Sequence, residues 1–191
     1  MSGSANLIVK TAHTLMSERG YSAFSYADIA ERIPLRKPSI HHHFPTKASL
    51  VVAVLQQYRE QLISATERLD NEFSNPLDRL RSIAKRWETC IRDRSESFCV
   101  VTLLGAELPA LPPEVGNEVK FYFGHLGSWL TKVFTEGRKS GSLSFQGSPR
   151  IEAEGFIASL HGAMLSARVY DDCSVYRDVM KSTLNRISNR I

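Results

Sequence analysis

Apolar residues recur at intervals of three and four along most of the chain, which is the spacing of one face of an α-helix. In the first such segment Ile8, Ala12 and Leu15 share a face, and Gly20 marks its end. The strict alternation of apolar and polar residues that is typical of strands is scarce. The pattern therefore predicts an all-α protein.

Two short helices are predicted next, in the stretch "FSYADIAERIPLRKPSIHHHF" (residues 24–44). Ser25 can cap the first of them, with Asp28 three residues later as a short-armed form of the capping box. Pro34 ends that helix, and Pro38 stands at a favoured first position of the next. The three N-terminal segments follow the order of a helix-turn-helix, over about 5–19, 26–33 and 38–44.

The rest of the chain predicts about six more helices, so that the whole protein has about nine. Thr46 and Ser174 are the predicted N-caps of the first and the last of these six. Their expected ranges are about 47–72, 75–94, 97–108, 113–139, 149–170 and 174–189. We expect a three-helix head over residues 1–47 and a helical body over residues 48–191.

Positive charge is concentrated near the N-terminus. Residues 1–50 contain six Lys or Arg and three acidic residues, a balance of +3, and the other 141 residues contribute only +1 to the total of +4. A basic head beside a near-neutral body favours a nucleic-acid partner. The alternative is a chance distribution of surface charge.

Several classes of protein are disfavoured by the composition. No apolar run reaches the roughly 18 residues of a membrane span, and the N-terminus lacks the basic and apolar succession of a secretion signal. Cys90, Cys99 and Cys173 are an odd number at wide spacings, which suits a reducing compartment better than a disulfide framework. We expect a cytoplasmic protein without a membrane partner.

The stretch "GYSAFSYADIAERIPLRKPSIHHHFPTKASLVVAVL" (residues 20–55) resembles the TetR family of bacterial transcription regulators. The similarity lies in a glycine, a Ser/Thr cap, "IA" in the second helix, a basic residue, and a short third helix ending in Phe with a lysine three residues later. The sequence departs from the family at Pro34, in place of a turn glycine, and at His41 and His43, in place of aromatic residues. The resemblance implies a homodimer that binds a palindromic operator in double-stranded DNA and responds to an unknown small-molecule effector.

The resemblance also implies which side chains contact DNA. Those expected at the phosphates are Ser25, Tyr26, His42, His43 and Lys47, and those expected along the major groove are Lys37, Pro38, Ser39 and His41. Phosphate contacts fix the register of a protein on DNA, whereas base contacts read the sequence. Lys37 can reach the acceptors of guanine, and a plain phosphate contact is the equal alternative.

Three consecutive histidines, His41 to His43, also raise the question of a metal site. Successive helical residues point about 100° apart, so the three rings cannot converge on one ion. No cysteine or carboxylate stands nearby at a ligand spacing, and no nucleophile with a positioned base is recognisable. We therefore expect no metal, no other cofactor and no catalytic residue.

The middle helices combine apolar side chains with a few polar groups, as ligand pockets do. The pocket candidates are Trp87, Cys99, Thr102, Leu103, Tyr122, His125, Trp129 and His161. Plain core packing is the alternative for each of them. In "SESFCVVTLLGAELPAL" (residues 95–111), Cys99 resembles a thiol with which some members of one TetR subgroup sense electrophiles or oxidants, although its apolar neighbours favour inert packing.

Small residues recur at three- and four-residue steps in the predicted helix 149–170. They are Gly155, Ala158, Ser159, Gly162 and Ser166. Small side chains let another helix approach closely, and the resemblance implies a four-helix dimer interface formed with the last helix. Packing within one chain is the alternative.

These features together predict a non-enzymatic transcriptional repressor that binds operator DNA as a homodimer and is released by a small-molecule or electrophile effector. One alternative is an activator or an architectural DNA-binding protein without an inducer. Another is an all-helical small-molecule enzyme, for which the sequence shows no acid–base constellation.

The histidines predict a pH dependence of DNA binding. A protonated imidazole adds a positive charge beside a phosphate, so DNA affinity at fixed salt should rise as the pH falls from about 7.5 to about 6. His42→Ala or His43→Ala should flatten this rise. Fluorescence anisotropy titrations with labelled DNA across this range measure the effect, and an affinity that does not change with pH would contradict it.

Overall fold

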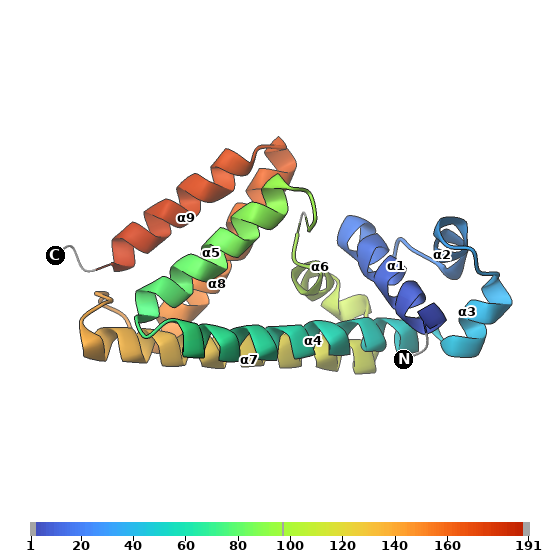
Figure 1. Cartoon of the computed structure of the whole chain (residues 1–191), viewed down its shortest axis with the longest axis horizontal. Helices are drawn as coiled ribbons and strands as arrows, with labels where there is room; N and C mark the ends of the chain where they lie inside the picture. Colours follow the sequence, from blue (N-terminus) through green and yellow to red (C-terminus); the bar gives the residue numbers. More distant parts are fainter. Residues whose placement is uncertain (1–2, 97, 189–191) are drawn as a thin grey trace. The chain divides into compact units, whose positions relative to one another are not determined.

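The computed structural model of the chain describes residues 3–96 and 98–188 (Figure 1). In these residues nine α-helices follow one another and no strand is present, so the all-α prediction is confirmed for the described part of the chain. The helices are α1 (Gly3–Arg19), α2 (Tyr26–Arg32), α3 (Lys37–His43), α4 (Lys47–Glu72), α5 (Pro76–Arg92), α6 (Val100–Ala106), α7 (Pro113–Ser140), α8 (Pro149–Tyr170) and α9 (Cys173–Ile187), with a 3₁₀ turn at Leu108–Ala110. None of the described helices has the length and apolar character needed to cross a membrane.

The predicted end signals of the first two helices are confirmed, whereas the third helix begins one residue earlier than predicted, at Lys37, so that Pro38 is its second residue. Gly20 ends α1 with a left-handed backbone (φ 78°), and its N–H donates to the Met16 carbonyl at 2.8 Å. The Asp28 carboxylate accepts the Ser25 N–H at 2.8 Å, as the capping box requires. Among the described residues of the α2–α3 turn none has a left-handed backbone, so Pro34 takes the place of a glycine without strain.

The later helix ends confirm one predicted cap and correct another. Thr46 caps α4, because its hydroxyl accepts the Ser49 N–H at 3.0 Å. Ser174 does not cap α9, because Asp172 does so: its carboxylate accepts the Ser174 N–H at 2.8 Å. The helix predicted over 97–108 is shorter, since Pro109 favours a change to a 3₁₀ turn. Residues 97 and 189, where two predicted helices begin and end, lie outside the described residues.

The chain divides into two compact units, which we describe separately. The first unit comprises Met1–Gln61 and Cys99–Tyr122, and the second comprises Leu62–Phe98 and Phe123–Ile191, in each case as far as the residues are described. Helix α6 and the start of α7 therefore belong with the N-terminal helices. The functional division predicted at residue 47 is a different kind of boundary and stays a prediction.

In the first unit, α1, α2 and α3 pack together beside the start of α4 (Figure 1). Each of these three helices contributes side chains that are completely buried. The largest of them are Ile8, Leu15 and Met16 from α1, Ile29 from α2 and Ile40 from α3. Burial of a side chain of this size contributes about 1.5–3 kcal/mol, so a few such contacts hold the two seven-residue helices in place.

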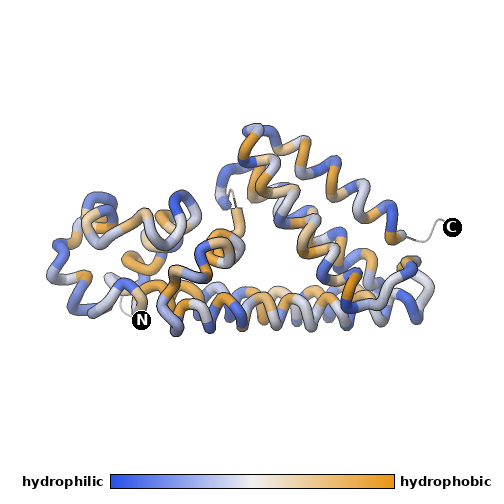
Figure 2. Tube along the Cα trace, turned by 180° about the vertical axis from the view of Figure 1, so that it is seen from behind, coloured by the Kyte–Doolittle hydropathy of each residue, from blue (hydrophilic) through white to orange (hydrophobic). Residues whose placement is uncertain are grey.

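In the second unit, α5, α8 and α9 lie side by side (Figure 1). Figure 2 shows apolar and polar positions alternating along these helices, as expected of helices with one buried face. Tyr176 of α9 is completely buried, and its hydroxyl donates to the Ala84 carbonyl of α5 at 3.0 Å. Phe134 and Phe156 meet edge to face in the same core, at 6.2 Å between ring centroids.

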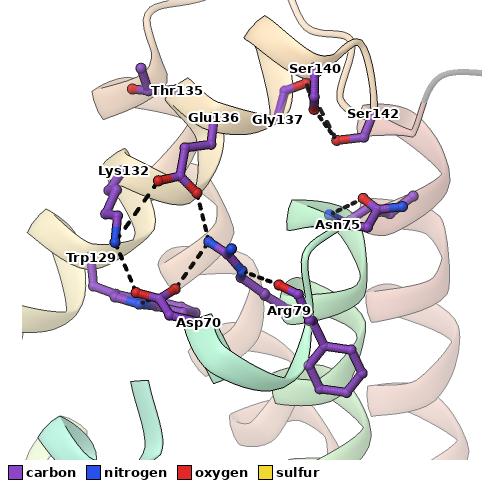
Figure 3. A network of polar contacts seen from close by, with 12 residues as sticks. Asp70, Asn75, Arg79, Trp129, Lys132, Thr135, Glu136, Gly137, Ser140 and Ser142 are labelled. Carbon is purple, nitrogen blue, oxygen red and sulfur yellow. Dashed lines mark hydrogen bonds and ion pairs between the residues drawn. The ribbon is translucent and has the colours of Figure 1, made fainter. Parts of the chain in front are cut away.

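Among the described residues of the second unit, one charged side chain is buried, at the junction of α4, α5 and α7 (Figure 3). Arg79 is only 7 % exposed, and its guanidinium satisfies three acceptors. Its Nε donates to the Phe73 carbonyl at 2.8 Å, and its Nη1 lies 3.0 Å from the Asp70 carboxylate and 2.7 Å from that of Glu136. A buried cation is tolerated when its donors are paired in this way.

The same network supplies a prediction about stability. Arg79→Ala leaves Asp70 and Glu136 without their buried partner, so the free energy of unfolding should fall by roughly 3 kcal/mol. Lys132 contacts the same carboxylate of Asp70 at 2.9 Å but is more than half exposed, so Lys132→Ala should cost less than about 1 kcal/mol. Urea unfolding at one fixed protein concentration measures both, and equal losses would show that burial of Arg79 is unimportant.

Candidate nucleic-acid interface and effector region

Helix α3 packs through one side and exposes most of the predicted groove residues. Ile40 is completely buried against the rest of the first unit, and Phe44, directly after the helix, is 8 % exposed. The exposed members of the predicted DNA-binding set on α3 are Lys37, Pro38, His41 and His42, and the half-buried ones are Ser39 and His43. The side of α3 opposite Ile40 is therefore open to a partner.

Tyr26 fixes the end of α3. Its hydroxyl donates to the Phe44 carbonyl at 2.8 Å, and the ring of His41 meets its ring edge to face at 4.6 Å. Burial, with a smaller contribution from Tyr21, raises the pKa of Tyr26 to about 12. The Tyr26 hydroxyl, which is predicted to contact a phosphate, thus already donates a hydrogen bond within the protein.

Two other predicted phosphate contacts also have partners within the head. The Ser25 hydroxyl donates to the Asp28 carboxylate at 2.6 Å. The Lys47 ammonium donates to the Phe24 carbonyl and lies over the rings of Tyr21 and Phe24, at 4.5 and 4.3 Å from their centroids. Partial burial lowers the pKa of Lys47. These contacts orient both residues, and their DNA roles stay predictions.

The three histidines point in different directions. His41 packs on Tyr26, whereas His42 and His43 face each other edge to face with 5.7 Å between ring centroids. The structure therefore does not bring the three rings to one point, in line with the helical geometry.

Ion pairs neutralise two cations of the head. Arg19 lies 3.2 Å from Asp28, and Arg32 lies 2.7 Å from Glu18 in a two-pronged contact. The hydrogen bond from Arg32 lowers the pKa of Glu18. Two of the positive charges counted in the head are therefore balanced locally by acidic side chains.

Arg36 and Lys37 are the two cations of the head that lie at the start of α3. They stand side by side at the start of α3, both exposed, and neither forms an ion pair with a described residue. Lys37 belongs to the predicted DNA contacts, and Arg36 does not. Its charge was counted, but its position in the predicted turn gave no sign that it would be the unpaired neighbour of Lys37.

Four pocket candidates lie in the first unit: Cys99, Thr102, Leu103 and Tyr122. Cys99 is completely buried, and this burial raises the pKa of its thiol, although the Thr102 side chain and N–H favour the thiolate. The ring of Tyr122 packs against that of Tyr58 at 5.5 Å. The thiol is therefore protonated and shielded.

The other four candidates lie in the second unit: Trp87, His125, Trp129 and His161. The Trp129 Nε1 donates to Asp70 at 3.2 Å, and His125 Nε2 lies 3.3 Å from the Thr66 hydroxyl. Burial lowers the pKa of His161 to about 4, so this imidazole is neutral near pH 7. The eight candidates are divided between the units, and as one pocket they stay a prediction.

Helix α8 exposes the predicted small residues together with large apolar ones. Gly155, Ala158 and Gly162 are exposed, and Ser159 and Ser166 are half-buried. On the same face Ile151, Leu165 and Val169 are 55, 52 and 71 % exposed. Residues 151, 155, 158, 162, 165 and 169, at steps of four, three, four, three and four, thus form an exposed stripe that no described part of the chain covers.

Comparisons with known proteins match both halves of the chain. Residues 8–54 match the family described as bacterial regulatory proteins, tetR family, and residues 76–183 match the tetracyclin repressor-like C-terminal domain. Two curated relatives are the transcriptional regulator AcuR of Cereibacter sphaeroides and the HTH-type transcriptional repressor DhaR of a Mycobacterium species. AcuR is 29 % identical over 160 residues (81 % of this chain, 71 % of AcuR), and DhaR is 27 % identical over 165 residues (85 and 81 %).

A solved structure, the TetR-family transcriptional regulator from Agrobacterium tumefaciens, is 42 % identical with a TM-score of 0.94, and the match covers 97 % of each chain. A second, from Legionella pneumophila, is 25 % identical with a TM-score of 0.86 and covers 98 % of this chain and 99 % of the other. With the helix-turn-helix head and the helical body described above, the chain belongs to the tetR family of DNA-binding bacterial transcription regulators.

Proposed function

We propose that the protein is a ligand-responsive repressor that binds a palindromic operator as a homodimer. The observation that supports DNA reading best is the pair of unpaired, exposed cations at the start of α3. Cations that lack an internal partner are free to pair with phosphates or guanine. Residues 1–47 are the reading head in this proposal, residues 48–191 respond to the effector, and the protein acts in the cytoplasm without a catalytic role. Repression, as opposed to activation, is supported by the relative DhaR, which is a transcriptional repressor.

The exposed stripe on α8 supports the homodimer. Contact between two copies of this stripe removes Ile151, Leu165 and Val169 from water, and the small residues between them permit close approach of the helices. A two-fold symmetric dimer presents two α3 helices to two half-sites, so the operator should be a palindrome.

The effector is proposed to be a small molecule that binds without a covalent bond. A thiol reacts as the thiolate and must be reachable, but Cys99 is completely buried with a raised pKa. An electrophile would first have to open the first unit, so reversible binding is the simpler proposal.

The operator experiment tests the proposal as a whole. Duplexes selected from a random pool for binding to the wild-type protein should contain a palindrome, bind two chains, and block transcription when placed across a promoter.

Leu165→Glu places two like charges at the two-fold contact, so the variant should be monomeric by light scattering and bind the palindrome at least about tenfold more weakly. Gln61→Glu adds the same charge at an exposed position of α4 and serves as the control. A monomeric wild type that protects only one half-site would reject the homodimer.

The two cations should differ in what they contribute. Arg36→Ala should weaken binding to all sequences alike and lower the slope of log affinity against log salt by about 1. Lys37→Ala should lower the slope similarly if Lys37 contacts a phosphate, and should relax preference at one base pair if it reads guanine. Titrations at several salt concentrations with single-base variants of the selected duplex measure both effects. Lys181→Ala on α9 is the charge-matched control. If Arg36→Ala and Lys181→Ala have the same salt slope, Arg36 does not contact DNA.

A further inference from the structure

The stretch "SESFCVVTLLGAELPAL" contains an acidic residue, Glu107, to which the proposed function gives no role. Glu107 follows the last residue of α6, and its side chain reaches the loop between α1 and α2, 85 residues earlier in the sequence. One carboxylate oxygen accepts the Tyr21 N–H at 2.7 Å. The other accepts the Ser22 N–H at 3.0 Å and the Ser22 hydroxyl at 2.7 Å. Three donors of one short loop are thus directed at one side chain.

The loop is shaped to receive an anion. Gly20 has a left-handed backbone, and the next two N–H groups, of Tyr21 and Ser22, point to the same carboxylate, which is the arrangement of an anion-binding nest. A Cβ atom at Gly20 would collide with the Glu107 carboxylate. Glycine is therefore needed here both for the backbone angle and for the closeness of Glu107.

Charge strengthens the contact. Burial raises the pKa of Glu107, but the hydrogen bonds from Ser22 and Tyr21 and the nearby charge of Lys47 outweigh it, and the pKa lies below its usual value. The carboxylate is therefore ionised near pH 7, and its hydrogen bonds are charge-assisted. The charge of Glu107 in turn favours the ammonium form of Lys47.

The two ends of α6 have different partners. Cys99 precedes the helix and is completely buried, as are Val100 and Leu104 within it. Glu107 follows the helix and contacts the loop that leads, three residues later, to the Ser25 cap of α2. A helix of seven residues is about 10 Å long and moves as a rigid body, so a shift at one end displaces the other.

We propose that Glu107 is a positioning residue for DNA binding. Its carboxylate ties the loop between α1 and α2 to the end of α6, so that the position of α6 sets the arrangement of the helices in the head. This inference rests on DNA binding by the head and not on the identity of the effector. A binding-competent arrangement that is populated only in part lowers the apparent affinity by that fraction. Loss of the Glu107 contact should therefore weaken DNA binding without unfolding the protein.

The sign of the effect makes Glu107→Gln a sharp test. Removing a negative charge should by itself leave DNA affinity unchanged or raise it slightly. If Glu107 positions the head, Glu107→Gln should instead bind the selected duplex about tenfold more weakly, because an NH2 donor replaces one of the two carboxylate oxygens that accept from the loop. Glu67→Gln on α4, an exposed position, is the matched control for the charge. Binding by Glu107→Gln at or above the level of Glu67→Gln, with the wild type binding normally, would overturn the inference.

Further measurements separate positioning from simple stabilisation. Circular dichroism establishes that each variant is folded at the assay temperature. Ser22→Ala removes one of the three hydrogen bonds and should give a smaller loss, about threefold, and it remains informative if Glu107→Gln does not fold. In NMR spectra, Cys99→Ala should shift the Tyr21 and Ser22 amide resonances when Glu107 is present and leave them unchanged in the Glu107→Gln background. Equal shifts in both backgrounds would mean that α6 does not act on the head through Glu107.

If the wild-type protein selects no duplex from the pool, the proposed repressor function fails, and that outcome is distinct from equal binding by wild type and Glu107→Gln.

Discussion

A helix of seven residues is not stable in water on its own, so α3 exists only because the rest of the first unit holds it. The contacts that hold it include Ile40 buried at its centre, Phe44 buried after its end, and the Tyr26 hydroxyl, which donates to the Phe44 carbonyl. These contacts use one side of the helix. They thereby determine which side chains of α3 remain outward, and the whole proposed interface with DNA depends on this division.

Contacts within the head occupy several of its positive side chains, so fewer cations are available to DNA than the net charge suggests. Arg19 and Arg32 are neutralised by acids, and Lys47 lies on aromatic rings. An ion pair at the surface contributes little to stability, but it withdraws a cation from competition for phosphate. Arg36 and Lys37 place two adjacent exposed cations where α3 begins, besides the exposed Lys10 on α1, and such a pair favours one orientation of the head on a polyanion.

The sequence predicted most of the fold because the signals for helix ends are local. Pro34, Pro38, Thr46 and Gly20 act on the backbone within a turn of their own positions, and the helices begin and end within about one residue of where they indicate. The error at α9 has the same origin, since Asp172 and Ser174 are both good caps and only the backbone conformation distinguishes them. Side-chain partners were harder to predict. The inward direction of Lys47 and the contact between Glu107 and Ser22 join residues 23 and 85 positions apart, and no local pattern encodes such a pairing.

The Pro34 turn has a consequence for the thermodynamics of recognition. A proline restricts the unfolded chain and fixes one backbone angle in the folded one, and here it does so between the two helices whose mutual orientation must match the groove. A glycine in its place would leave that angle far less restricted in the unfolded chain. With Pro34 part of this freedom is already absent from the unfolded chain, so less conformational entropy is lost when the turn adopts the arrangement that an operator requires.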